Sequence, residues 1–137
     1  LRCRSDVIGL LQYFDSSRNM EMTNALLAFQ ALGQPTRLAV FRVLVQTGSA
    51  GLAAGDIARA LDLRPNTLST HLGILVQSGL LTATRDGRSI RYFADMGGLR
   101  ALMSWMLQDC CGGKAETCGP ILDQIVCACK EVQNEDL

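Results

Sequence analysis

The cysteines of this sequence have the clearest potential for chemistry. Five of the six lie near the C-terminal end, at Cys110, Cys111, Cys118, Cys127 and Cys129. Disulfide frameworks belong mainly to small secreted domains that cannot build a core, whereas 48% of this chain is hydrophobic. The cluster therefore indicates soft-metal binding or thiol redox chemistry rather than a structural disulfide network.

The closest spacing joins Cys110, Cys111 and Cys118. Neighbouring positions on a regular helix point roughly 100° apart, so the first two sulfurs converge only where the helix ends. Gly112 and Gly113 follow directly and favour such an end, and a six-residue spacer allows Cys118 to return toward the pair. The segments before these thiols must therefore supply a helix that stops near residue 111.

The formal net charge of zero hides an uneven distribution along the chain. Residues 22–108 carry eight arginines and four acidic side chains, a net charge of +4. Residues 109–137 carry two lysines and six acidic side chains, a net charge of −4. A basic body with an acidic tail is compatible with phosphate binding by the body.

No segment predicts a membrane span or a secretory signal. The longest apolar windows, 25–32 and 38–45, are far shorter than the ~20 residues that a membrane-spanning helix requires. The first residues lack the basic and long apolar regions of a signal peptide. We therefore expect a cytoplasmic protein with no membrane partner.

Three segments are expected along the chain. Residues 1–21 form an N-terminal extension, which is either a native arm or a leader foreign to the native protein. Residues 22–111 form the folded domain, and residues 112–137 form a cysteine-containing tail that is helical from about residue 120.

Apolar periodicity predicts two helices at the start of the domain. The first covers 22–32, where Met22, Ala25, Leu26 and Phe29 share one face. Gly33 ends it, and Pro35 suits the first turn of a second helix that runs to about Gln46. This second helix is expected to bury Leu38, Phe41, Leu44 and Val45.

A loop at 47–53 is expected to lead into a helix–turn–helix pair. The short third helix would bury Ile57, Ala58 and Leu61. Arg64-Pro65 interrupts the chain, and a fourth helix follows at about 66–78. Its predicted buried residues are Leu68, Leu72, Leu75 and Val76.

A hairpin and a further helix complete the predicted domain. Two short strands, at 81–85 and 89–94, flank Asp86-Gly87, a dipeptide that favours a tight turn. The last helix covers about 96–110, and its apolar face consists of Leu99, Leu102, Met103 and Met106. The fold class is therefore mainly α, a winged helix-turn-helix with a two-stranded β-hairpin wing.

Side chains suited to DNA lie at two places in this arrangement. The first half of the fourth helix would be the part that reads DNA, because its small polar residues can enter a groove. Arginines on the hairpin would reach the backbone or the adjacent minor groove. The predicted DNA-binding residues are Asn66, Thr67, Ser69, Thr70, Arg85, Arg88 and Arg91.

Enzymatic activity is not expected. His71 lies between Leu68 and Leu75 on the inner face of the fourth helix and is expected to be a core residue. The sequence has no Ser/His/Asp or Cys/His arrangement of the kind that hydrolases use, and no phosphate-binding glycine loop.

Several motifs together resemble the ArsR/SmtB family of metal-responsive repressors. They are Leu32-Gly-Gln-Pro-Thr-Arg-Leu38, Gly55-Asp-Ile-Ala58, Leu68-Ser-Thr-His-Leu72, Gly79-Leu-Leu81 and Arg85-Asp-Gly-Arg-Ser-Ile-Arg-Tyr92. The resemblance covers about 25–110 and implies a winged-helix homodimer that represses its own resistance operon and leaves operator DNA when metal binds. It implies dimer contacts from the first and last helices of the domain, here through Leu26, Phe29, Leu99, Leu102, Met103 and Met106, although a core role within one chain fits the last four nearly as well.

The effector site departs from one pattern of that family. Many arsenic-responsive members carry cysteines in the helix before the recognition helix, but Gly55–Leu61 contains none. Cys110, Cys111 and Cys118 instead resemble a variant site, in which a vicinal cysteine pair and a third cysteine just beyond the last helix bind arsenite. As(III) is the expected inducer, with Sb(III) as a second candidate.

Other responses remain open from the residues alone. Zinc normally takes four ligands with histidine or carboxylate among them, and these thiols have no histidine nearby, so As(III) or Sb(III) is favoured. Cadmium, lead or bismuth would be compatible with Cys127 or Cys129 as a fourth ligand. A disulfide between Cys118 and either Cys110 or Cys111 would instead make the protein a thiol redox sensor.

Overall fold

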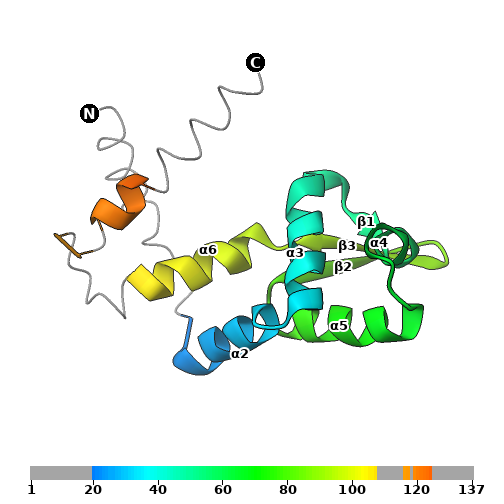
Figure 1. The fold of residues 1–137 in the computed structure, drawn as a ribbon, viewed down its shortest axis with the longest axis horizontal. Helices are drawn as coiled ribbons and strands as arrows, with labels where there is room; N and C mark the ends of the chain where they lie inside the picture. The colour runs from blue at the N-terminus through cyan, green and yellow to red at the C-terminus, as the bar shows by residue number, and fades with distance from the viewer. Residues whose placement is uncertain (1–19, 108–115, 118, 125–137) are drawn as a thin grey trace, which may run out of the picture. The chain divides into compact units, whose positions relative to one another are not determined.

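The structure is a computed structural model that describes residues 20–107, 116–117 and 119–124. Residues Met20–Leu102 form one compact unit, and the described residues from Met103 onward belong to a second unit. The elements, in chain order, are α2 (Met22–Leu32), α3 (Pro35–Thr47), a 3₁₀ turn (Gly48–Ala50), β1 (Leu52–Ala53), α4 (Ala54–Leu61), α5 (Pro65–Gln77), β2 (Leu81–Asp86), β3 (Ser89–Ala94) and α6 (Met96–Trp105). This order confirms the predicted winged helix-turn-helix fold (Figure 1).

Local sequence explains where the helices begin and end. Pro35 and Pro65 each occupy the first turn of a helix, where the missing N–H costs nothing. The Gln34 side chain accepts a hydrogen bond from the Arg37 backbone N–H at 2.8 Å and caps α3. Asp62, with φ 51°, ends α4 in the left-handed conformation that short polar residues tolerate.

The wing belongs to a three-stranded antiparallel sheet rather than to an isolated hairpin. The strand order is β1-β3-β2, with Leu52 paired to Tyr92 and Leu81 paired to Ala94. The prediction of a plain loop at 47–53 is therefore wrong. A two-residue strand has no periodicity of its own, so only its pairing with β3, about forty residues later, defines it.

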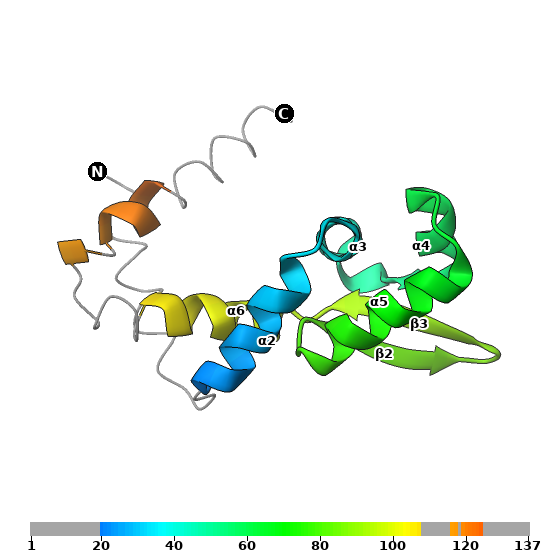
Figure 2. The ribbon, with the colours of Figure 1, turned by 60° about the horizontal axis from the view of Figure 1, so that its bottom comes forward.

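The core lies between the helices and the sheet. In both ribbon views α5 runs alongside the β2–β3 hairpin, which it contacts through β2, while α3 contacts β3 and α5 (Figures 1 and 2). The buried apolar side chains of α3, α4, α5 and β2 include Val40, Phe41, Leu44, Ile57, Leu68, Leu72, Leu75 and Leu81. The predicted inner face of α5 is thus confirmed at its three leucines.

The structure corrects one predicted core residue of α3 and shows which face of α2 is buried, which the periodicity did not assign. Helix α2 buries Ala25, Ala28 and Ala31, whereas most of its larger apolar residues are exposed. Leu38 of α3 is 42% exposed, and Val40 is buried instead. Periodicity gives the angle between residues on a helix but not which face meets a neighbour, and here α2 approaches α3 and α5 through its small side chains.

Helix α6 begins as predicted. Asp95 caps it, because its Oδ1 accepts a hydrogen bond from the Gly98 N–H at 3.1 Å. The predicted end of this helix near residue 110 lies outside the described residues. Residues 119–124 are helical, in agreement with the helix predicted from about residue 120. Within the described ranges no helix is long and apolar enough to cross a membrane.

Candidate DNA-binding interface and effector region

The helix-turn-helix unit consists of α4, the short turn Asp62–Arg64 and α5. The Leu63 N–H donates to the Ala58 carbonyl at 2.9 Å, which holds the turn against α4. Burial of one face of α5 leaves its opposite face open. The four predicted DNA-reading residues lie on that face and are all exposed: Asn66, Thr67, Ser69 and Thr70.

The start of α5 presents additional groups that the sequence reasoning did not select. Arg64 occupies the N-cap position, and its side chain makes no capping hydrogen bond. The first backbone N–H groups of a helix attract phosphate, and an exposed guanidinium beside them adds positive charge. The arginine directly before a helix-starting proline was the available signal for this position.

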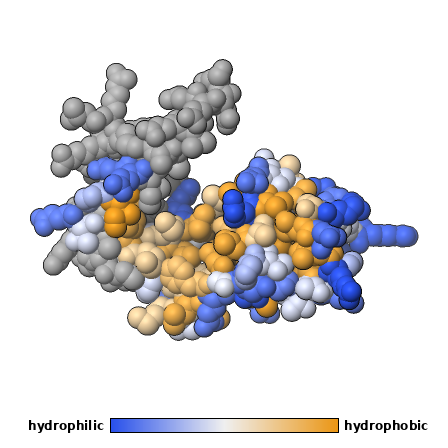
Figure 3. Space-filling model, viewed as in Figure 1, coloured by the Kyte–Doolittle hydropathy of each residue, from blue (hydrophilic) through white to orange (hydrophobic). Residues whose placement is uncertain are grey.

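The wing carries two exposed arginines. Arg85 lies on β2 opposite Ile90 of β3, and Arg88 follows Gly87 in the turn between the strands. Gly87 has φ 63°, the left-handed conformation that the tight turn requires. On the face shown in Figure 3, hydrophilic surface gathers at the end of the molecule that carries this turn. Both side chains are therefore accessible from solvent.

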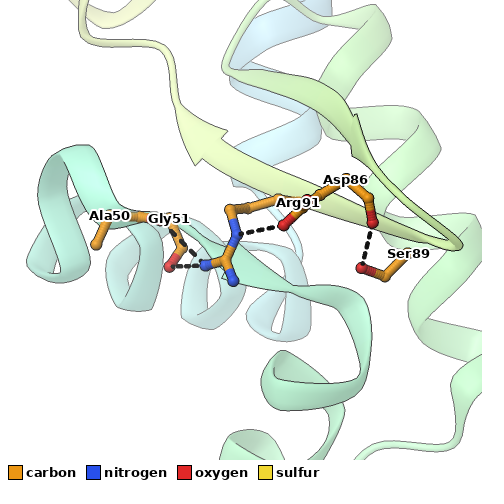
Figure 4. A network of polar contacts seen from close by, with 5 residues as sticks. All are labelled: Ala50, Gly51, Asp86, Ser89 and Arg91. Carbon is orange, nitrogen blue, oxygen red and sulfur yellow. Dashed lines mark hydrogen bonds and ion pairs between the residues drawn. The ribbon is translucent and has the colours of Figure 1, made fainter.

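Arg91 is held differently from the other two wing arginines. Its Nη1 donates to the carbonyl oxygens of Ala50 and Gly51, both at 3.1 Å, and its Nε lies 3.9 Å from an Asp86 carboxylate oxygen (Figure 4). The guanidinium thus ties the wing to the turn before β1. Its side chain is 36% exposed. These contacts assign Arg91 a structural role within the domain.

The predicted dimer residues divide into exposed and covered groups. Leu26 and Phe29 of α2 are 53% and 40% exposed, and Met103 and Met106 are 43% and 38% exposed. Leu102 is 2% exposed and therefore already covered, while Leu99 is half-buried.

His71 lies on α5 and is half-buried rather than fully enclosed. Its ring faces the guanidinium of Arg37, which reaches it from α3. This cross-helix contact was not predicted, because Arg37 has no local pattern that distinguishes it from the other arginines of the domain.

The candidate effector thiols Cys110, Cys111 and Cys118 lie outside the described residues, as do Cys3, Cys127 and Cys129. Among the residues that are described, no group of three or more histidine, cysteine or acidic side chains could hold a metal ion. The thiol site therefore stays a prediction from the sequence.

Comparisons with known proteins agree with this fold. A helix-turn-helix domain family matches residues 32–83. The chain is 32% identical over 79 residues to the transcriptional repressor SdpR of Bacillus subtilis, a match that covers 58% of this chain and 84% of SdpR.

Two solved structures are also similar. An ArsR-like transcriptional regulator from Rhodococcus sp. RHA1 superimposes with a TM-score of 0.56 at 25% identity, over 80% of this chain and 92% of that one. A possible transcriptional regulator for arsenical resistance does so with a TM-score of 0.51 at 27% identity, over 56% of this chain and 77% of that one. With the winged helix-turn-helix geometry described above, these matches place the chain in the ArsR/SmtB family of DNA-binding transcriptional regulators, which are not enzymes.

Proposed function

We propose that this chain is a cytoplasmic repressor that binds operator DNA as a homodimer and dissociates from it when As(III) binds Cys110, Cys111 and Cys118. Sb(III) has the same ligand preference and is a second inducer. The observation that carries the proposal is the spacing of these three thiols, which follow the predicted dimer helix directly.

The DNA-binding part of the proposal assigns α5 to the major groove. Its exposed polar residues Asn66, Thr67, Ser69 and Thr70 face away from the core, and Arg85 and Arg88 contact the flanking backbone. In a dimer, two such helices would enter successive major grooves about 34 Å apart.

Exposed apolar side chains support the homodimer. Leu26, Leu27 and Phe29 are each at least 40% exposed on α2, and Met22 is 65% exposed. Several large apolar side chains exposed on one helix indicate an interaction site. A second copy that covers α2 would remove this surface from water.

The donor set supports As(III). Thiolates are soft ligands, and As(III) binds three of them in a pyramid. Cys110 lies five positions after Trp105, the last residue of α6, so ligand binding would act on the segment that follows α6. One similar structure is that of a possible transcriptional regulator for arsenical resistance.

Release of DNA would follow from linkage. Arsenite must bind more tightly to a dimer whose two α5 helices are wrongly spaced for the operator. By reciprocity, bound DNA then weakens arsenite binding by the same factor.

The test begins with a fluorescein-labelled duplex, selected by the protein itself from a random-sequence library. Arsenite should lower the anisotropy of the wild-type complex. Cys110→Ser, Cys111→Ser and Cys118→Ser should each abolish this response, while Cys3→Ser, outside the cluster, should retain it. Unchanged release in Cys110→Ser would overturn the site assignment.

Two further measurements separate the alternatives. Native mass spectrometry of arsenite-loaded protein should show one arsenic per chain with loss of three thiol protons. Release by hydrogen peroxide without metal, reversed by a reductant, would instead establish a thiol redox sensor. Release by cadmium, lead or bismuth but not by arsenite would establish a different soft-metal regulator.

A further inference from the structure

Arg37 joins three helices of the compact unit through one side chain. It lies in the first turn of α3, and its guanidinium reaches backward to the end of α2 and across to the middle of α5. Nε donates to the Ala31 carbonyl at 2.7 Å, and Nη2 donates to the Gln30 carbonyl at 3.2 Å. Nη1 lies 3.5 Å from Nδ1 of His71.

The contacts to α2 have a clear physical basis. The last carbonyl groups of a helix have no partner within that helix, and the end carries partial negative charge. A guanidinium supplies several donors in a planar fork and satisfies two carbonyls at once. The backbone N–H of Arg37 is itself held by the Gln34 side chain at 2.8 Å, so both ends of the residue are held in place.

The contact to α5 has a defined polarity. A guanidinium can only donate, so this contact is a hydrogen bond in the tautomer of His71 that leaves Nδ1 as the acceptor. His71 directly follows Thr70 and lies one helical turn after Thr67, two of the exposed polar residues of α5. A displacement of His71 therefore displaces the face that is proposed to read DNA.

We infer that Arg37 is a positioning residue for DNA recognition, which holds α5 at a set distance from the end of α2. Because α2 carries the exposed apolar residues of the proposed dimer interface, movement of α2 would be passed to α5 through this guanidinium. The inference rests on the proposed role of α5 as the helix that reads DNA, and it assigns Arg37 no contact with DNA.

The test compares variants by fluorescence anisotropy on the selected duplex, without arsenite. Arg37→Gln should weaken DNA binding about 10-fold, the loss expected for hydrogen bonds to a charged group. Arg42→Gln is the matched control, since it removes the same charge from an exposed position of α3. His71→Leu should weaken binding to a similar extent, and His71→Gln, which retains an acceptor, should restore much of it.

A double-mutant cycle distinguishes positioning from a general structural effect. The Arg37→Gln/His71→Leu protein should bind DNA no more weakly than the worse single variant, because both changes break one connection. The chain has one histidine, so its ¹⁵N ring resonances are unambiguous. The Nδ1 resonance should shift in Arg37→Gln and remain unchanged in Arg42→Gln.

Several results would overturn the inference. One is a folded Arg37→Gln protein that binds DNA as tightly as Arg42→Gln; another is additive losses in the double variant. If Arg37→Gln does not fold, Arg37→Lys and His71→Leu carry the same test. If Asn66→Ala loses DNA binding but the Arg37 and His71 variants do not, only the inference about Arg37 is overturned. If Asn66→Ala and the other α5 surface variants all retain DNA binding, the assignment of α5 as the helix that reads DNA is overturned.

Discussion

Gly98 of α6 lies directly against Gly79, in the short link between α5 and β2. A Cβ atom on Gly98 would approach the Gly79 carbonyl oxygen to 1.9 Å, a distance that no pair of real atoms of this kind adopts. The Asp95 N–H also donates to the Leu80 carbonyl at 2.8 Å beside this contact. The start of α6 therefore packs against the backbone that links α5 to the wing.

Gly98→Ala should accordingly destabilise the domain. The added methyl group meets backbone rather than a flexible side chain, so the free energy of unfolding should fall by about 2–3 kcal/mol. Urea denaturation followed by circular dichroism would measure this change. Gly73→Ala is the matched control: it lies in the interior of α5 with open space at its Cβ position, and it should raise stability by about 0.5–1 kcal/mol. Equal effects of the two substitutions would show that the close approach is absent.

Arg91→Gln should destabilise the wing and its attachment to β1. The change removes hydrogen bonds to the Ala50 and Gly51 carbonyls, and the cost should be about 1–2 kcal/mol because the site is partly exposed. Arg88→Gln, on the exposed turn, should change stability by less than about 0.5 kcal/mol. Thermal or urea unfolding distinguishes the two variants. An unchanged unfolding midpoint in Arg91→Gln would refute the structural role of Arg91.

Removal of either exposed wing arginine should lower DNA affinity and weaken its dependence on salt concentration. Arg85→Gln and Arg88→Gln should each weaken binding. Each should also make the negative slope of the logarithm of the association constant against the logarithm of salt concentration shallower by about 0.9, the value for one lost phosphate contact. Anisotropy titrations at several salt concentrations provide the slope. Arg42→Gln, on α3 outside the proposed interface, should leave the slope unchanged. Slopes that match the wild type in both wing variants would remove Arg85 and Arg88 from the interface.

Leu26→Glu should disrupt the proposed homodimer. Leu26 is 53% exposed on α2, and a carboxylate buried at a dimer interface carries a large desolvation cost. Sedimentation velocity should show a shift from dimer toward the 14.8 kDa monomer. Leu38→Glu is the control, because Leu38 is 42% exposed on α3 and lies outside the proposed interface. Retention of the dimer in Leu26→Glu would exclude α2 from the interface.

The sequence by itself determined the order of the main elements and where most of them begin. Helix starts at Pro35 and Pro65, the left-handed Gly87 in the wing turn and the leucine spacing of α5 are local signals, because each acts through its own residue or the next turn. The same locality made the exposed polar face of α5 predictable, since the buried leucines define the opposite face.

Only the tertiary structure decided which face of α2 is buried, that β1 pairs with β3, and that Arg37 and Arg91 hold separate elements together. These outcomes depend on residues that are far apart in sequence: Arg91 contacts the turn forty positions earlier, and Arg37 contacts His71 thirty-four positions later. An arginine that holds backbone carbonyls and one that is free to meet phosphate have the same local pattern. Their roles differ because packing brings acceptors to one guanidinium and leaves the other in solvent.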